Sequence, residues 1–323
     1  MAVYTHLSSV DLANLIAEYD VGELVSAKGI AEGVSNSNWL VETTQGRFIL
    51  TMYERRIDPA DLPFFLGLLD FLSERGCPVP RTIHDRSGAA WRTIDGKAVA
   101  LIEFLPGVSV DVPTPSQARA VGAALAGLHI AVADFPLHCE QAMGLAEWSR
   151  LIDACGTAGL GEIDPALPQL AADELAYLHK HWPAGLPRGV VHCDLFPDNV
   201  LMLGDEVTGL IDFYFSADDF FAYDLAVTHA AWCFLPGGRE FRADVSEALL
   251  SGYRGVRPLS ADEETALPLL ARGACMRFLS SRAYDWLNTP ADALVTRKDP
   301  LDFARRLEFY TARGAGAFPS RPA

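Results

Sequence analysis

The sequence predicts an α+β protein with two lobes: a small N-terminal lobe built on an antiparallel sheet, and a larger, mainly helical C-terminal lobe. Two observations lead to this fold class. Short β-branched and aromatic runs separated by turn residues dominate the first part of the chain, and long apolar stretches at helical spacing dominate the rest. Pro106-Gly107 lies where the pattern changes. We therefore expect lobes over residues 1–105 and 106–323.

The N-terminal pattern contains both helical and extended segments. Ser8 or Ser9 can cap a first helix, and Gly76 followed by two prolines can end the second. In chain order we expect a helix over 10–19, a hairpin whose loop is 33–38, a strand over 47–53, a helix over 60–75 and strands ending at 98–104.

The C-terminal pattern is helical on both sides of one extended segment. We expect helices over 116–133, 173–181, 222–233, 245–253, 262–286 and 300–314. A looser region rich in Pro and Gly is expected over 135–168, and no internal repeat is present. Two lobes with a cleft between them are a common setting for a nucleotide.

The composition excludes several classes of function. The net charge of −16 would repel nucleic acid, and 50% hydrophobic residues argue against disorder. The N-terminus does not resemble a signal peptide, and no uncharged apolar run is long enough to span a membrane. The six cysteines contain no C-x-x-C pair, which is typical of reduced thiols in a cytoplasmic protein. The composition does not determine the oligomeric state, and a homodimer is one possibility.

The segment VVHCDLFPDNVL, residues 190–201, carries the most chemical information. His192, Asp194 and Asn199 follow the order H-x-D-x-x-x-x-N, the catalytic-loop arrangement of kinases. Asp212 follows within the apolar run LIDFYF, where a carboxylate is costly unless it is paired or binds a metal. In this pattern Asp194 would accept a proton from a hydroxyl, and Asn199 and Asp212 would hold magnesium. The alternative for DLFPDN is an ordinary surface turn, which would leave Asp212 unexplained.

Beyond this segment the chain resembles the aminoglycoside phosphotransferase and choline kinase superfamily, which has a protein-kinase-like fold. The resemblance covers nearly the whole chain and rests on GVSNSNW, IEFLPG, LAGLH, VVHCDLFPDNVL, LIDFYF and YDLA. Within the superfamily the chain is most similar to the homoserine kinases of bacterial threonine biosynthesis, through GVSNSNWLVET, RFILTMYERR, LPFFLGLLDFL, IDFYFSADDFFAYDLA, AWCF and RFLSSRAYDWLN with LVTRKDP.

The resemblance implies a role for each motif. Asp194 is implied as the base, and Asn199 and Asp212 as magnesium ligands, while His192 and Asp224 would support the catalytic loop. Residues implied to contact ATP are Gly33, Ser35, Asn36, Ser37 and Asn38 over the phosphates, and Glu103, Phe104 and Leu105 at the adenine hinge. The structural alternatives are an ordinary hairpin loop for residues 33–38 and an edge strand that enters a Pro-Gly turn for residues 103–105.

One position departs from the kinase pattern. Related kinases carry a lysine on the strand after the hairpin, and Thr51 stands at the apparent position here. Arg47, Arg55 or Arg56 could replace it, and the period-2 alternation of a strand does not choose among them.

The acceptor is expected to be a small hydroxylated amine, L-homoserine by resemblance, whose carboxylate would need an arginine and whose ammonium would need carboxylates or carbonyls. The candidate acceptor ligands are Asp218, Asp219, His229, Trp232, Arg277, Arg282 and Asp285. Two alternatives stay open: the same chemistry on an aminoglycoside or choline, and a nucleotide-binding pseudokinase, which the missing lysine favours and the retained Asp194, Asn199 and Asp212 oppose.

Overall fold

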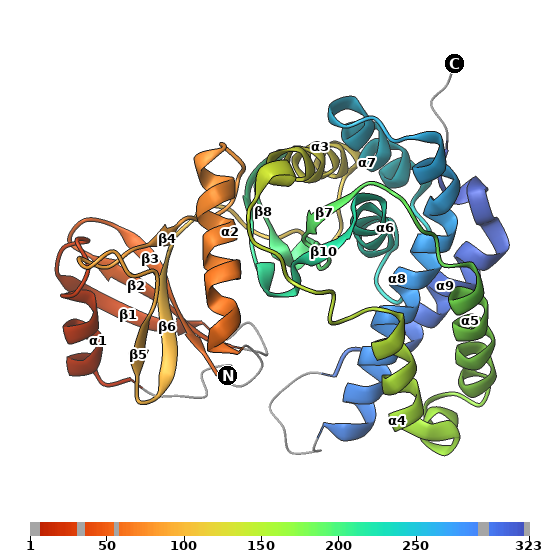
Figure 1. Ribbon diagram of the computed structural model, residues 1–323, viewed down its shortest axis with the longest axis horizontal. Coiled ribbons are helices and arrows are strands. Elements are labelled where there is room, and N and C mark those ends of the chain that lie inside the picture. Colours follow the sequence, from red (N-terminus) through yellow and green to blue (C-terminus); the bar gives the residue numbers. More distant parts are fainter. Residues whose placement is uncertain (1–6, 31–35, 55–57, 290–296, 320–323) are drawn as a thin grey trace. The chain divides into compact units, whose positions relative to one another are not determined.

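The computed structural model describes residues 7–30, 36–54, 58–289 and 297–319, and within it the chain divides into two compact units (Figure 1). Unit 1 is Met1–Gly107 and unit 2 is Val108–Ala323. The expected lobe boundary was 105/106, at the same Pro-Gly turn. No helix in the described residues is both long enough and apolar enough to cross a membrane.

Unit 1 is an antiparallel sheet with helices. Its elements are α1 (Ser9–Ile16), β1 (Leu24–Ile30), β2 (Asn36–Thr43), β3 (Arg47–Tyr53), η1 (Pro59–Asp61), α2 (Leu62–Glu74), β4 (Thr82–Ile83), β5 (Arg92–Ile94) and β6 (Lys97–Glu103). The strand order is β1-β2-β3-β6-β4, with β5 paired to β6, and every pair is antiparallel. This is the small α+β lobe that the sequence predicts.

The core of unit 1 lies between α1 and one face of the sheet. Ser8 caps α1 through a reciprocal bond with Asp11, as the sequence predicts. Leu12, Leu15 and Ile16 of α1 then pack on alternate residues of the sheet, among them Leu50 and Met52 of β3. The residues between these positions, including Thr51, face the opposite side of the sheet.

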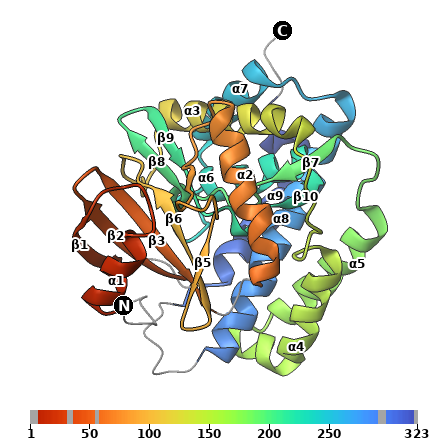
Figure 2. The ribbon, with the colours of Figure 1, turned by 60° about the vertical axis from the view of Figure 1, so that its left-hand side comes forward.

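Unit 2 combines two small two-stranded sheets with long helices (Figure 2). Its helices are α3 (Pro115–Ala131), α4 (Leu145–Ile163), α5 (Leu167–His181), α6 (Phe221–Trp232), α7 (Ala243–Val256), α8 (Ala261–Asn288) and α9 (Leu301–Arg313). One sheet pairs β7 (Arg188–Val191) with β10 (Ala217–Phe220), and the other pairs β8 (Val200–Leu203) with β9 (Glu206–Leu210). The expected loose region over 135–168 was wrong, because α4 occupies much of it.

Two helix contacts set the frame of unit 2. Every residue of α6 is buried, which makes it the central helix, and it packs on α8. The helices α3 and α7 approach closely at Gly122 and Gly252, where an added Cβ would clash with the backbone carbonyls of Leu249 and Arg119 respectively. The two views agree that α3 and α7 lie side by side.

Candidate active site

The candidate catalytic loop connects β7 to β8 and is fixed first at its entrance. Strand β7 pairs antiparallel with β10, so Val191 lies opposite Ala217. The chain then passes through His192 and Cys193 and makes one 3-10 turn over Pro197–Asn199 before entering β8. The strands β7 and β8 therefore hold the loop at its two ends.

Asp224, in the first turn of α6, is the buried hub of this loop. Its carboxylate accepts backbone N–H bonds from His192 and Cys193, each at 2.7 Å, and lies 3.0 Å from Nε2 of His129. Burial alone would raise the pKa of Asp224, but the bond from His129 and the neighbouring donors hold that pKa below its usual value. An ionised carboxylate with three donors binds the loop strongly to α6.

His129 completes a chain of hydrogen bonds behind Asp224. Its Nδ1 lies 2.7 Å from the Tyr253 hydroxyl, which in turn accepts a bond of 3.2 Å from Arg257. Burial lowers the pKa of His129, so the ring is neutral, with its proton on Nε2 toward Asp224. The sequence analysis assigned no role to His129, although it ends the LAGLH motif.

His192 joins the loop to the segment that carries Asp212. Its Nε2 lies 3.0 Å from the Ile211 carbonyl oxygen, and its Nδ1 accepts the Asp194 N–H at 3.2 Å. A carbonyl only accepts and an N–H only donates, so the ring is the neutral tautomer protonated on Nε2. Burial also lowers its pKa. Because both ring nitrogens are hydrogen-bonded to backbone groups, His192 supports the loop and is not available to exchange a proton with a substrate.

Two further side chains hold the loop from the helices. The guanidinium of Arg277 on α8 donates to the Cys193 carbonyl oxygen, and the Trp232 indole N–H donates to the Leu195 carbonyl oxygen at 2.9 Å. Cys193 has a left-handed backbone, with φ of 60°, which is unusual for a residue other than glycine. Arg277 and Trp232 were candidate acceptor ligands. Both are buried and donate to backbone carbonyl oxygens of the loop, so they support the loop.

Asp194 and Asn199 are in direct contact. The Asn199 amide nitrogen donates to the Asp194 carbonyl oxygen at 2.7 Å and to its carboxylate at 3.2 Å. With Nδ2 directed at Asp194, the amide oxygen of Asn199 points elsewhere, and no described residue donates to it. Asn199 therefore offers one oxygen to a cation while its other end orients Asp194.

Asp212 lies beside Asn199 because of one backbone bond. The Ile211 N–H donates to the Asn199 carbonyl oxygen at 3.0 Å, directly before Asp212. The expectation that Asp212 lies buried within a strand was wrong: β9 ends at Leu210, and Asp212 has a left-handed backbone, with φ of 65°, before the 3-10 turn η4 (Phe213–Phe215). Its side chain is exposed, so a cation in solvent can reach it.

The carboxylates of Asp194 and Asp212 influence one another. Burial and the nearby Asp212 raise the pKa of Asp194 to about 7, against the opposing effect of Arg277. The protein packed around Asp212, together with Asp198, raises the pKa of Asp212 to about 6. Part of both side chains stays accessible to solvent, and this accessible surface decides whether a cation can approach. Two neighbouring carboxylates that repel each other are relieved when a cation binds.

The predicted ATP contacts belong to unit 1. Gly33, Ser35 and the alternative cations Arg55 and Arg56 lie outside the described residues. The expected loop over 33–38 was too long, because Asn36, Ser37 and Asn38 already belong to β2. Glu103 ends β6 and accepts the Arg81 N–H at 3.3 Å, and Phe104 and Leu105 follow it toward Pro106.

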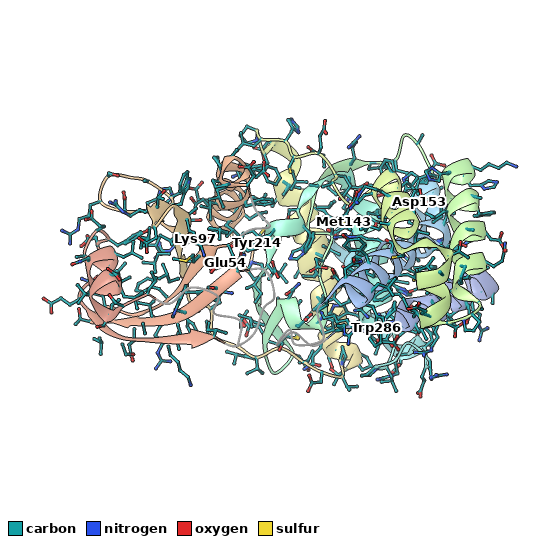
Figure 3. All side chains as sticks on the ribbon, turned by 90° about the horizontal axis from the view of Figure 1, so that it is seen from below. Glu54, Lys97, Met143, Asp153, Tyr214 and Trp286 are labelled. Atoms are coloured by element: carbon teal, nitrogen blue, oxygen red, sulfur yellow. The ribbon has the colours of Figure 1, made fainter. Side chains whose placement is uncertain are left out.

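The position of the missing strand lysine is occupied by a neutral hydrogen bond. Thr51 donates to the Asn38 side-chain oxygen at 2.9 Å and lies opposite Ala100 on β6. Lys97 forms an ion pair with Glu54, which joins the start of β6 to the end of β3 (Figure 3). Because Lys97 is three residues from Ala100 on the same strand, it faces the other side of the sheet from Thr51. Lys97 therefore does not replace the strand lysine.

The remaining acceptor candidates are dispersed. His229 is buried, with its two ring nitrogens 2.6 Å from the Tyr310 hydroxyl and 2.7 Å from the Ser246 hydroxyl, and burial lowers its pKa to about 3. Asp218 accepts from the Cys139 N–H at 3.1 Å and contacts His138. Asp285 is exposed on α8.

Arg282 is the acceptor candidate with an electrostatic connection to the loop. It pairs with Asp302 at 3.5 Å, and burial together with Arg306 lowers its pKa to about 10 against the opposing charges of Asp302, Asp194 and Asp198.

Comparison with known proteins agrees with this geometry. The model of the phosphotransferase enzyme family matches residues 26–259. The homoserine kinase of Azorhizobium caulinodans is 50% identical over 312 residues, which are 97% of this chain and 97% of that protein. The homoserine kinase of Paramagnetospirillum magneticum is 49% identical and covers 96% of each chain.

Solved structures share the fold at much lower identity. A spectinomycin phosphotransferase in complex with ADP and spectinomycin superposes with a TM-score of 0.74 at 12% identity, over 97% of this chain and 100% of that one. An amicoumacin kinase in complex with AMP-PNP and Ca²⁺ superposes with a TM-score of 0.70 at 15% identity, over 97% and 96%. These structures confirm the predicted protein-kinase-like fold class. The chain belongs to the phosphotransferase enzyme family and, within it, to the homoserine kinases.

Proposed function

We propose that the protein transfers the γ-phosphoryl group of ATP to the hydroxyl of L-homoserine, giving O-phospho-L-homoserine for threonine biosynthesis and ADP. The observation that carries this proposal is identity of about one half to homoserine kinases over almost the whole of both chains. The cysteines in the described residues are free thiols, so we place the reaction in the cytoplasm.

Asp194 has the position of the base. The hydroxyl oxygen of the acceptor attacks the γ-phosphorus, the bond from that phosphorus to the bridging oxygen breaks, and its electron pair leaves with ADP. The hydroxyl proton passes to the carboxylate of Asp194. The bonds from Asn199 and the loop anchored on Asp224 keep that carboxylate in place, which is the contribution that positioning makes to the rate.

Asn199 and Asp212 would hold Mg²⁺. An amide oxygen without a donor, an accessible carboxylate and the backbone bond that places them together fit a hard cation, which takes one or two protein oxygens and completes its shell with phosphate and water. The bound cation would neutralise charge on the transferring phosphoryl group. No group of three or more His, Cys, Asp or Glu suited to a metal occurs in the described residues, as expected for a site that relies on substrate phosphates.

In unit 1, Asn36 and Asn38 remain our candidates for the phosphates and the backbone from Glu103 to Leu105 for adenine, whereas the Ser37 side chain is fully buried and bonded to Glu54. In unit 2, Arg282 is our candidate for the homoserine carboxylate, because its nearest acidic partner lies at 3.5 Å and leaves its donors incompletely used. We exclude His229, Trp232 and Arg277 from the acceptor site because each is buried and bonded within unit 2.

The test is ADP release from the wild-type protein with ATP, MgCl₂ and one acceptor at a time: L-homoserine, choline, or an aminoglycoside. We expect turnover with L-homoserine, and a loss of several orders of magnitude in Asp194→Asn with ATP still bound. Preference for choline or the aminoglycoside would reject the acceptor, and near-normal turnover by Asp194→Asn would reject the base.

A further inference from the structure

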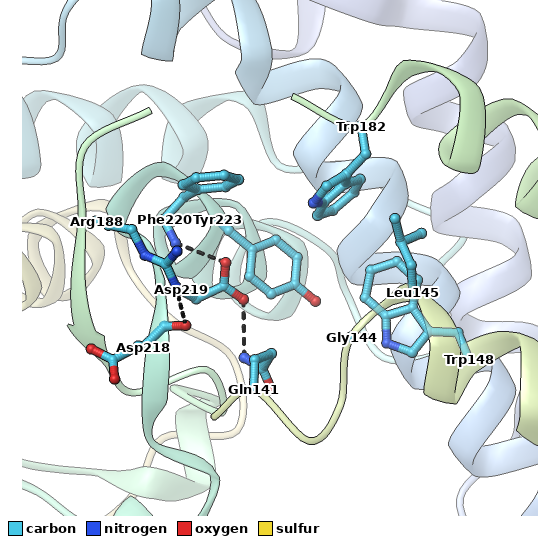
Figure 4. A pocket seen from close by; sticks show the side chains of 10 residues that line it. All are labelled: Gln141, Gly144, Leu145, Trp148, Trp182, Arg188, Asp218, Asp219, Phe220 and Tyr223. Atoms are coloured by element: carbon cyan, nitrogen blue, oxygen red, sulfur yellow. Dashed lines mark hydrogen bonds between the residues drawn. The ribbon is translucent and has the colours of Figure 1, made fainter. Parts of the chain in front are cut away.

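One cavity in unit 2 is not lined by the residues assigned to phosphoryl transfer. Its volume is about 210 Å³, and it lies between the start of α4, Trp182 and the junction of β10 with α6 (Figure 4). Of the described residues, neither Asp194, Asn199 nor Asp212 lines it. A cavity of this size can hold a small organic ligand.

The inner walls of the cavity are aromatic and rigid. Trp182 packs edge to face on both Trp148 and Tyr223, with ring centres 5.5 Å and 5.7 Å apart respectively. The Trp148 N–H donates to the Met143 carbonyl oxygen at 2.6 Å, which fixes that indole. Trp148 and Tyr223 are fully buried and support Trp182, whose partly exposed ring would bind an apolar group or the methylene groups next to an ammonium.

The cavity also contains a partly buried acidic group. Asp219 accepts from the Gln141 amide at 3.0 Å and from the Phe220 N–H at 2.8 Å, both neutral donors. No described Lys, Arg or His forms an ion pair with it. Burial raises the pKa of Asp219, and the nearby charge of Arg188 opposes this effect only in part. An incoming ammonium would give Asp219 a cation in direct contact.

A basic group stands at the rim. The exposed Arg188 donates to the backbone carbonyl oxygen of Asp218 at 3.1 Å, and no described carboxylate forms an ion pair with it. Most of its five N–H donors remain for a ligand. Figure 4 shows Arg188 and Asp219 on the same side of the cavity, opposite Trp148. An ammonium site, a carboxylate site and an aromatic wall within one small cavity match the parts of an α-amino acid.

We propose that this cavity binds a small zwitterionic α-amino acid, with its ammonium on Asp219, its carboxylate on Arg188 and its side chain against Trp182. We thus assign Asp219 to the cavity and not to the acceptor, and Arg282, the candidate for the homoserine carboxylate, does not line the cavity. The cavity touches the catalytic loop at one point, because the same Gln141 amide that holds Asp219 also donates to the Cys193 thiol at 3.4 Å, next to Asp194. Occupancy would thus fix Gln141 against the loop.

The experiment is an equilibrium titration that needs neither ATP nor turnover. L-2-aminobutyrate has both charges of an amino acid and no hydroxyl to phosphorylate, and Trp148 and Trp182 report its binding through tryptophan fluorescence. Propylamine and butyrate, which each carry one of the charges, serve as ligand controls. We expect L-2-aminobutyrate to bind at least tenfold more tightly than either.

The variants separate this site from the acceptor site. Arg188→Ala and Asp219→Asn should each weaken L-2-aminobutyrate binding at least tenfold. Arg150→Ala, an exposed arginine on α4 that pairs with Glu147, should leave it unchanged. The KM for L-homoserine should stay within twofold of wild type in Arg188→Ala and in Arg150→Ala.

Three outcomes would overturn the proposal: no fluorescence change with L-2-aminobutyrate, equal binding by the two cavity variants and wild type, or a KM for L-homoserine that rises in step with the lost binding. The last would assign the cavity to the acceptor itself. Thermal unfolding of each variant shows whether a loss of binding reflects a loss of fold. Because the titration is independent of catalysis, a protein that does not phosphorylate L-homoserine could still pass it.

Discussion

Replacing Asp224 with Asn tests the reasoning about the catalytic loop most directly. The substitution keeps the shape of the side chain and removes its charge. An Asn side chain has one acceptor oxygen, whereas the Asp224 carboxylate uses one oxygen for the Cys193 N–H and the other for His192 N–H and His129 Nε2. In the less costly orientation the new amide nitrogen faces the Cys193 N–H, so two donors meet in a buried site.

The magnitude follows from these three bonds. A buried N–H left without an acceptor costs about 1–3 kcal/mol, and the two remaining bonds each lose about 1 kcal/mol when their acceptor becomes neutral. Relief from burying a charge offsets part of this loss. We therefore expect Asp224→Asn to lower the free energy of unfolding by about 2–4 kcal/mol. Because Cys193 directly precedes Asp194, we also expect kcat to fall by about 10–100-fold, as for other small misplacements of a catalytic group.

Urea denaturation followed by far-UV circular dichroism measures the first quantity, and ADP release under saturating substrates measures the second. Asp153→Asn, on the solvent-facing side of α4, is the matched control for the same chemical change. A loss of stability below about 0.5 kcal/mol, the usual range for surface substitutions, would refute the assignment of Asp224 as the hub. Normal kcat in a destabilised variant would refute the link between the hub and the base.

Three other predictions follow from separate parts of the structure. Asp212→Ala should abolish the magnesium dependence of ATP affinity in isothermal titration calorimetry, and an affinity that still rises with MgCl₂ would contradict the ligand assignment. His229 has a pKa of about 3 in the folded protein against 6.5 in the unfolded chain, so its contribution to stability is complete above pH 6.5 and is lost as the pH falls toward 3. In urea titrations, His229→Gln should therefore reduce the difference in stability between pH 7.5 and pH 5 by about 2 kcal/mol. Gly252→Ala should destabilise unit 2 by at least about 2 kcal/mol because of the clash with α3, whereas Gly255→Ala, where a Cβ meets open space, should be neutral or mildly stabilising in thermal unfolding.

The sequence predicts the fold class and the family because both can be recognised from local sequence patterns, without knowledge of tertiary contacts. Helical spacing, the Pro106-Gly107 turn and the order of His192, Asp194 and Asn199 are local features. They led to an antiparallel sheet followed by helices, which the structure has. The homoserine kinase expectation is confirmed by the relatives.

The errors have physical causes that a single sequence does not reveal. Asp212 follows an apolar run typical of a strand, and only the left-handed backbone at that residue ends the strand before it. The helix α4 was missed because its Gly and Pro neighbours suggest a loop, and the chain does break the helical geometry inside it at Gly156. Asn36 and Ser37 are residue types common in loops, but both belong to β2. The Ser37 hydroxyl donates to the Glu54 carboxylate at 2.6 Å, which satisfies this buried side chain within the strand.

The acceptor candidates show how burial decides between chemistry and support. Arg, Trp and His are the residue types expected at both an acceptor site and a catalytic-loop anchor, so residue type alone leaves Arg277, Trp232 and His229 undecided. All three lie on α6 or α8, the helices that meet in the middle of unit 2, and there each finds a partner that replaces water. Arg188 and Asp219 lie at the cavity wall, where the charge of Arg188 acts on Asp219, and neither forms an ion pair with a described residue. Polar groups that are bonded inside a core support it, and polar groups left incomplete at a cavity are the ones available to a ligand.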